Sequence, residues 1–150
     1  MNIDVKKASS PAEMQQCWAI RTKVFVDGQQ VPLHEDRDGK DQDSEHYLLF
    51  IDAQAVGVAR VRFIERCAKI ERVAILDEYQ GLGLGKAIMQ QILADLHQNP
   101  AVIAAKLSAQ TQAIPFYEKL GFRVCSEEYL DANIPHKDMK LSFSSLGIGL

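Results

Sequence analysis

Three glycines at alternate positions form the stretch of the sequence with the clearest chemical meaning. Gly81, Gly83 and Gly85 lie between an apolar run that ends at Leu76 and a helix predicted to begin near Leu84. Glycines let a backbone approach a bulky anion, and the first turn of a helix offers unpaired N–H groups at the positive end of its dipole. The order of strand, glycine loop and helix therefore predicts a phosphate-binding loop. The alternative is a helix that packs closely on a strand through small residues.

The spacing of these glycines excludes two common phosphate-binding loops. A Walker loop ends in Gly-Lys-Ser/Thr, but Lys86 is followed by Ala87. A dinucleotide-binding fingerprint has two residues between its second and third glycines, whereas a single residue fills each gap here. A loop of a different kind is needed to explain the pattern.

The elements that position this loop are predicted from hydrophobic periodicity and from end signals. Ser10 and Pro11 begin a first helix that runs to about Val26. An apolar stripe predicts a second helix over 84–97, and Gly121 ends a short helix over 112–120. Strands are expected over 3–7, 46–51, 55–65, 68–76, 102–109, 122–129 and 137–143. This order predicts one domain over 1–150, a mixed, mostly antiparallel sheet flanked by helices in the α+β (mixed α/β) class, with a loose tail over 144–150.

A long acidic segment, Asp27–Asp43, separates the first helix from the first hairpin. Long loops in compact domains are often functional, so this segment is a candidate for attracting a cationic substrate. Its other interpretation is a solvated acidic surface. The carboxylates concerned are Glu35, Asp36, Asp38, Asp41 and Asp43.

Composition excludes several classes of protein. The 150 residues are 47% hydrophobic and 25% charged, which is typical of a globular domain. The net charge of −3 and the absence of a basic stripe argue against nucleic-acid binding. No apolar run approaches the roughly 18 residues of a membrane span, and the N-terminus lacks the apolar core of an export signal.

The cysteines indicate a reducing compartment. Cys17, Cys67 and Cys125 are odd in number and lack CxxC spacing, so they predict neither a disulfide framework nor a zinc site. We therefore expect a cytoplasmic protein without a metal centre.

Two motifs together resemble the GNAT superfamily, the acyl-CoA-dependent N-acetyltransferases. Gln80, Gly83 and Gly85 match its Gln/Arg-x-x-Gly-x-Gly/Ala pattern. The segment from Gln110 to Phe122, with Tyr117 inside it, resembles the family's Asn-x-x-Ala-x-x-x-Tyr-x-x-x-Gly-Phe segment. Other stretches look most like a bacterial branch, the YjcF and ElaA-like proteins. The resemblance implies the GNAT fold and acetyl-CoA as cosubstrate.

The resemblance also implies where acetyl-CoA binds. The pyrophosphate would be held by Gln80 and the backbone of Gly81, Leu82, Gly83, Leu84, Gly85 and Lys86. Pantetheine would lie along Val73, Ala74 and Ile75 like an added strand, next to a bulge that is usual in the family. Gln110 replaces the family's common Asn, and its longer amide still donates and accepts hydrogen bonds.

Residue chemistry then suggests catalytic roles. An alkylamine has a pKa of about 10.4, so a base must remove its proton at neutral pH. Glu71 is the first candidate, and its alternative is a strand carboxylate paired with a cation such as Lys69. Tyr117 is the candidate acid for the leaving thiolate, its alternative being an aromatic anchor for the short helix. The backbone N–H of Val73 is a candidate donor to the oxyanion.

The acceptor is expected to be a primary amine of a small molecule or peptide. Phe25, Gln29 and Gln30 are candidates for one wall of its site, and His136 could act as a base, hold substrate or have neither role. A non-catalytic acyl-CoA-binding sensor or structural subunit is the alternative function, followed by a domain whose loop holds another nucleotide. Family members often dimerise, so a homodimer is a further expectation.

Overall fold

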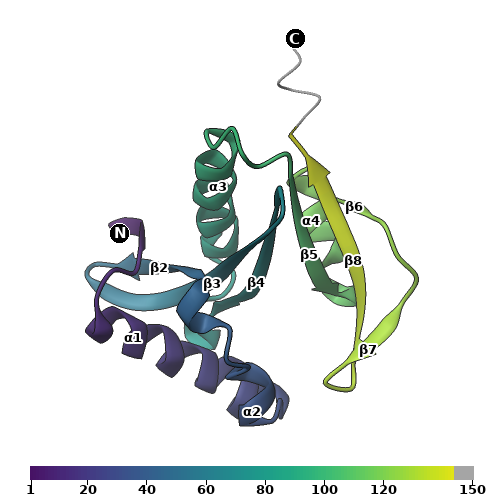
Figure 1. Ribbon diagram of the computed structural model, residues 1–150. Helices are drawn as coiled ribbons and strands as arrows, with labels where there is room; N and C mark the ends of the chain where they lie inside the picture. The colour runs from purple at the N-terminus through teal and green to yellow at the C-terminus, as the bar shows by residue number, and fades with distance from the viewer. Residues whose placement is uncertain (144–150) are drawn as a thin grey trace.

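The computed structural model describes residues 1–143, and the expected tail over 144–150 lies outside the described residues. Eight strands form one sheet in the order β1-β2-β3-β4-β5-β8-β6, with β7 paired to β8 (Figure 1). The strands are β1 Ile3–Lys7, β2 Glu45–Ile51, β3 Gln54–Ile64, β4 Cys67–Ile75, β5 Ala104–Gln110, β6 Arg123–Val124, β7 Tyr129–Asp131 and β8 Ile134–Ser142. The helices are α1 Pro11–Arg21, the π-helix η1 Thr22–Asp27, α2 Leu33–Asp36, α3 Leu84–His97 and α4 Ile114–Lys119, with 3₁₀ turns at Asp41–Asp43, Asp77–Tyr79 and Thr111–Ala113. The predicted mixed sheet with flanking helices is confirmed.

The sheet divides where β4 leaves β5. These two strands pair in parallel, and their register ends at the pair Ile70 and Leu107, while all other pairings are antiparallel. On the other side of β4, one residue of β3, Ala59, faces two of β4, Arg72 and Val73, which is the expected bulge. Arg72 lies in this bulge with φ +56, a left-handed conformation that is uncommon outside glycine. The bulge bends β4, and its last residues run apart from β5 (Figure 1).

Helices cover both faces of the N-terminal part of the sheet. Six consecutive residues of β3, from Val56 to Val61, are buried, and a strand is buried in this way only when both of its faces are covered. Helix α1 packs on β2, β3 and β4, and α3 packs on β1 to β4 (Figure 1). The predicted bounds of α3 are confirmed, and the helix buries Leu84, Ile88, Met89, Ile92 and Leu96.

The first helix starts as predicted and ends differently. The Ser10 hydroxyl accepts a hydrogen bond from the Glu13 N–H at 3.2 Å, which caps α1. The α-helical part stops at Arg21, and one π-helical stretch then continues to Asp27. This stretch carries Val24 and Phe25, which line a cavity.

Three other expectations were wrong. The segment Asp27–Asp43 is not an irregular loop, because it contains the end of η1, helix α2 and a 3₁₀ turn. The single strand expected over 122–129 is two short strands, β6 and β7, separated by a bend. Strand β8 begins at Ile134 rather than Lys137, so His136 lies within it.

Among the described helices, none combines the length and apolar character that crossing a membrane requires.

Candidate functional site

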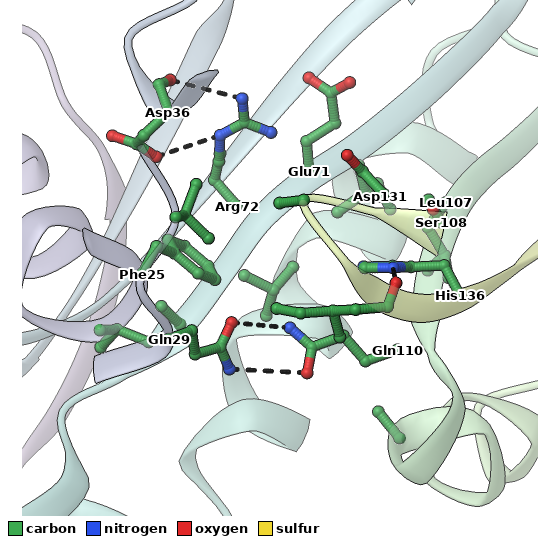
Figure 2. Close-up of a pocket in the computed structure, with 18 of the residues that line it drawn as sticks. Phe25, Gln29, Asp36, Glu71, Arg72, Leu107, Ser108, Gln110, Asp131 and His136 are labelled. Atoms are coloured by element: carbon green, nitrogen blue, oxygen red, sulfur yellow. Dashed lines mark hydrogen bonds and ion pairs between the residues drawn. The ribbon is translucent and has the colours of Figure 1, made fainter. Parts of the chain in front are cut away.

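A cavity of about 340 Å³ lies where β4 and β5 separate. The π-helix and α2 line one side, β4 and β5 the middle, and α4 with the β7–β8 hairpin the other side (Figure 2). Segments from both ends of the chain thus meet at the bulge in β4. Of the expected site residues, this cavity is lined by Phe25, Gln29, Glu71, Val73, Ala74, Ile75, Gln80, Gln110, Tyr117 and His136.

A second cavity of about 480 Å³ adjoins the first. The two share Val73, Ala74, Ile75, Gln80 and Ala113, so the end of β4 forms one continuous wall. Beyond Ile70 no described strand pairs with β4 on the side that faces β5. The backbone of β4 is therefore open to an extended ligand. The glycine loop closes the second cavity with Gly81, Gly83, Leu84, Gly85 and Lys86.

The glycine loop has the geometry of an anion cradle. Gly81 and Gly83 have φ values of +82 and +77, conformations that favour glycine. Gly83 is the N-cap of α3, and no side chain caps this end. The first intrahelical bond runs from the Ala87 N–H to the Gly83 carbonyl at 3.1 Å, which leaves the preceding N–H groups of the turn without helical partners. These observations fit a phosphate ester.

Two residues of the predicted loop behave differently from their neighbours. Leu82 lines neither cavity, and 49% of its surface is exposed. Gln80 turns its side-chain amide back, donating to the Ile75 carbonyl at 3.2 Å and to the Asp77 carboxylate at 3.3 Å. It joins the end of β4 to the loop, and it lines both cavities.

Tyr117 presents a phenol to the first cavity from α4. Its ring makes edge contacts with Phe116 and Phe122, with centroids 5.0 and 6.0 Å apart. Its hydroxyl has no hydrogen-bond partner among residues 1–143. Burial raises the pKa of Tyr117 to about 12, so the group stays protonated at neutral pH. The ring of Tyr117 thus packs in the aromatic cluster that anchors α4, while its hydroxyl keeps a proton that no described residue binds.

Glu71 is held by arginines rather than left free. One carboxylate oxygen accepts hydrogen bonds from Arg60 and Arg62, and the other accepts from Arg62 at 2.9 Å. Lys69 is also 3.6 Å from this carboxylate, as the alternative interpretation expected. Burial alone would raise the pKa of Glu71, but the hydrogen bonds and charges of Arg62 and Arg60 lower it to about 2. This environment favours the ion-paired interpretation over that of a base.

The acidic segment is neutralised by the same cluster. Asp36, Asp38 and Asp41 bind arginines, and Asp36 is 1% exposed. The interpretation as a solvated acidic surface was therefore wrong for these three groups. The arginine cluster, as we name it, consists of Arg21, Arg60, Arg62 and Arg72 with Asp36, Asp38, Asp41 and Glu71.

Arg60 and Arg72 connect the acidic segment to the sheet. Arg60 is fully buried and bridges Asp38 at 2.8 Å, Asp41 at 2.9 Å and Glu71. Arg72 reaches from the bulge to the Asp36 carboxylate at 3.2 Å and to the Glu35 carbonyl at 2.9 Å (Figure 2). Sequence analysis missed these arginines. The excess of carboxylates over 35–43 was the signal that cations had to lie nearby.

On the other side of the bulge, one of the two glutamines expected in the substrate wall lies outside the cavity. Gln29, not Gln30, lines the cavity, and its amide faces that of Gln110 (Figure 2). Gln110 donates to Gln29 at 2.9 Å and accepts from Gln112 at 2.6 Å. Gln30 is exposed and donates to the Asp27 carbonyl at 3.1 Å. Phe25 contributes its ring to the cavity, as expected.

His136 lies on β8 with its ring toward the cavity (Figure 2). The residue is 8% exposed, and its Nδ1 is 2.6 Å from the Ile134 carbonyl. The ring stacks on Tyr129 with centroids 6.1 Å apart. Tyr129 in turn contacts Ser108 and donates to Asp138 through its hydroxyl.

Comparisons with known proteins agree with this architecture. The family model described as an acetyltransferase (GNAT) domain matches residues 11–143. The uncharacterized N-acetyltransferase YjcF of Bacillus subtilis is 37% identical over 133 residues, which is 88% of this chain and 94% of that protein.

Solved structures give the same result. An acyl-CoA N-acyltransferase from Pseudomonas aeruginosa superposes with a TM-score of 0.83 at 28% identity, covering 94% of this chain and 99% of that one. ElaA from Escherichia coli superposes with a TM-score of 0.85 at 25% identity, covering 94% and 100%. The fold that contains β4, the glycine loop and α4 is thus shared with these two proteins.

Proposed function

The chain belongs to the GNAT acetyltransferase family, and on this premise we propose that it transfers an acetyl group from acetyl-CoA directly to a primary amine of a small molecule or peptide. The observation that carries the proposal is the pair of adjoining cavities along the unpaired end of β4. One cavity holds the phosphate cradle, and the other holds acid–base side chains. An acyl donor that spans both would meet an acceptor in the first cavity, which allows direct transfer in a ternary complex.

Acetyl-CoA fits the second cavity by its chemistry. We assign its pyrophosphate to the backbone N–H groups of Gly81–Lys86, with Lys86 adding a positive charge. Its pantetheine amides suit the open backbone of Val73, Ala74 and Ile75. Bound there, the cosubstrate supplies a thioester, whose carbonyl carbon accepts a nitrogen nucleophile. The Gln80 side chain holds the end of β4 against the glycine loop. Leu82 would contact the pyrophosphate through its backbone alone.

Two groups of this chain would stabilise the reaction. The backbone N–H of Val73, in the bulge, is proposed as the donor to the developing oxyanion. The Tyr117 hydroxyl is proposed as the acid that protonates the departing thiolate, because it lines the cavity, stays protonated at neutral pH and has no hydrogen-bond partner among residues 1–143. The ring contacts with Phe116 and Phe122 hold this hydroxyl in the cavity.

The amine would enter beside Phe25 and Gln29. The Gln29–Gln110 amide pair limits the cavity at this end, so it is proposed to contact the acceptor rather than acetyl-CoA. Gln30 is not retained in this role, because it lies outside the cavity. The cytoplasmic location and the homodimer stay predictions.

Calorimetric titration with acetyl-CoA, followed by a thiol-release screen over primary amines, tests the proposal. We expect acetyl-CoA to bind, and at least one amine to release free CoA and appear as its N-acetyl product by mass spectrometry. Binding without release on a broad panel would favour the acyl-CoA sensor instead. Binding of ATP or NAD with no binding of acetyl-CoA would favour another nucleotide.

A further inference from the structure

The geometry of the cavity points to His136 as the catalytic base of the proposed acetyl transfer. We infer that its Nε2 takes the proton from the acceptor amine and that Glu71 instead holds β4 and the acidic segment in place. The inference rests on the proposed function, and it assigns the residue that prepares the nucleophile.

The hydrogen bond of His136 selects the tautomer that a base needs. A backbone carbonyl only accepts, so the contact of 2.6 Å requires Nδ1 to carry a proton and to donate to Ile134. In the neutral ring the lone pair then lies on Nε2. Nε2 has no hydrogen-bond partner among residues 1–143 and is not sealed from solvent. The ring therefore offers an unoccupied acceptor to whatever fills the cavity.

The surroundings of His136 hold it at a fixed place opposite the bulge. Strand pairing sets His136 beside Gln110, whose amide reaches the acceptor end of the cavity. Tyr129 stacks on the ring, and its hydroxyl is tied to Ser108 on β5 and Asp138 on β8. A base needs such orientation as much as it needs a lone pair. Tyr129 is thus a positioning residue for His136.

Glu71 lacks the corresponding freedom. Both of its oxygens accept hydrogen bonds from arginines, and its pKa is held near 2. A carboxylate so strongly favoured in its charged form has little tendency to take a proton near neutral pH. Its removal would also leave the buried Arg60 without one of its three anionic partners.

The proposed step balances without any further reactant. His136 Nε2 removes one proton from the ammonium group and passes it to water. The freed nitrogen lone pair forms the C–N bond to the acetyl carbon, and the C–S bond breaks with its electron pair on sulfur. Tyr117 donates its proton to the thiolate, and the second nitrogen proton restores the phenol through solvent.

Other titratable and charged groups surround His136 and bear on any pH profile. The ring faces groups on its own hairpin and on the elements across the cavity. They are Tyr129 and Asp131 on β7, Asp138 on β8, Tyr117 on α4, Glu35 and Asp36 on α2, and Lys69, Glu71 and Arg72 on β4. Of these, Glu71 and Tyr117 have pKa values near 2 and 12, so neither titrates near neutral pH.

The test compares pH–rate profiles of H136N, H136Q and E71Q with that of the unchanged protein, using an amine found in the thiol-release screen. The Asn amide retains a donor near the Nδ1 position but lacks the Nε2 lone pair, and Gln gives a second variant should Asn misfold. For both histidine variants we expect kcat/KM for the amine to fall about 10²- to 10⁴-fold and the acid limb of its profile to disappear. E71Q should keep that limb.

Two readouts separate a base from a structural residue. The dissociation constant of acetyl-CoA should stay within about twofold in folded H136N, and the loss of rate should shrink for amines that are already neutral at the assay pH. An equal loss for all amines with the acid limb intact, or weakened acetyl-CoA binding, would overturn the role of His136. An unchanged protein that binds acetyl-CoA but releases no thiol would instead overturn the proposed function.

Discussion

The two sides of the cavity satisfy their polar groups in opposite ways. On the side of β4 and α2, the four arginines and four carboxylates of the arginine cluster pair with one another. On the side of α4 and β8, the Tyr117 hydroxyl and His136 Nε2 have no partner among residues 1–143. The two sides line the same cavity and face each other across it, beside the bulge in β4 (Figure 2).

This difference distinguishes the paired charges, which fix the structure of the site, from the unpaired side chains, which are available for proton transfer. A buried charge whose partners are all present is fixed in one ionisation state and geometry. A group that keeps a proton or a lone pair without a partner is available for transfer. We therefore propose that Tyr117 and His136 carry out the proton transfers, and that Glu71, the first candidate base in the sequence, has a structural role.

The largest effect should follow from removing Arg60. R60M leaves Asp38, Asp41 and Glu71 with a missing partner in a buried place, and breaking such a cluster costs about 3–5 kcal/mol in the free energy of unfolding. Urea denaturation measures this cost. R62M is the matched control, because Arg62 is 19% exposed and bonds Glu71 alone, so it should cost much less. Equal losses for the two variants would show that the cluster does not depend on Arg60.

The second-largest effect should follow from removing the hydroxyl of Tyr117, the proposed acid. Y117F keeps the ring contacts with Phe116 and Phe122 but removes the hydroxyl, so kcat should fall about 10²-fold. Titration calorimetry should find acetyl-CoA binding unchanged and the melting temperature close to that of the unchanged protein. A kcat within twofold of normal would leave Tyr117 as an anchor only.

Acid should weaken the arginine cluster only at low pH. The pKa values of Glu71 and Asp41 are lowered to about 2, because arginine hydrogen bonds and charges outweigh the opposing effect of burial. Their stabilisation is complete above the unfolded pKa of about 4 and is lost as pH falls toward 2. Melting temperature should therefore be level from pH 8 to about pH 5 and then decline. A decline that begins near neutral pH would contradict this assignment.

A smaller effect distinguishes two glycines of the cradle. G83A places a side chain at φ +77, which costs about 1–2 kcal/mol of stability. G85A is the matched control, since Gly85 lies within α3 and its added methyl group meets only Phe116 at 3.5 Å. G85A should leave both unfolding and acetyl-CoA binding almost unchanged, because the family pattern accepts Ala at this position and the added methyl group makes an ordinary contact. Equal losses of stability in G83A and G85A would contradict the left-handed requirement at Gly83.

Local signals made part of the molecule predictable from sequence. The glycine loop and α3 follow from spacing and periodicity within 20 residues, and the Ser10 cap from its neighbours. The mixed sheet follows from the order of its elements.

The remaining features depend on contacts between distant residues. Arg21, Arg60 and Arg72 meet the acidic segment only after folding, so no local spacing identifies them as its partners. Gln29 and Gln30 were both candidates for the substrate wall, and of the two Gln29 alone lines the cavity. The π-helix that precedes them has no signal in the sequence pattern, so the direction of their side chains could not be predicted.

A crystal structure with bound CoA is the most direct test of the account. We expect the pyrophosphate on the backbone of Gly81–Lys86, the pantetheine along Val73–Ile75, and the thiol in the first cavity facing Tyr117. Such a complex would also show whether His136 Nε2 borders the space left for the amine. A CoA molecule bound outside these two cavities, or one whose thiol points away from Tyr117 and His136, would contradict the proposed site of acetyl transfer.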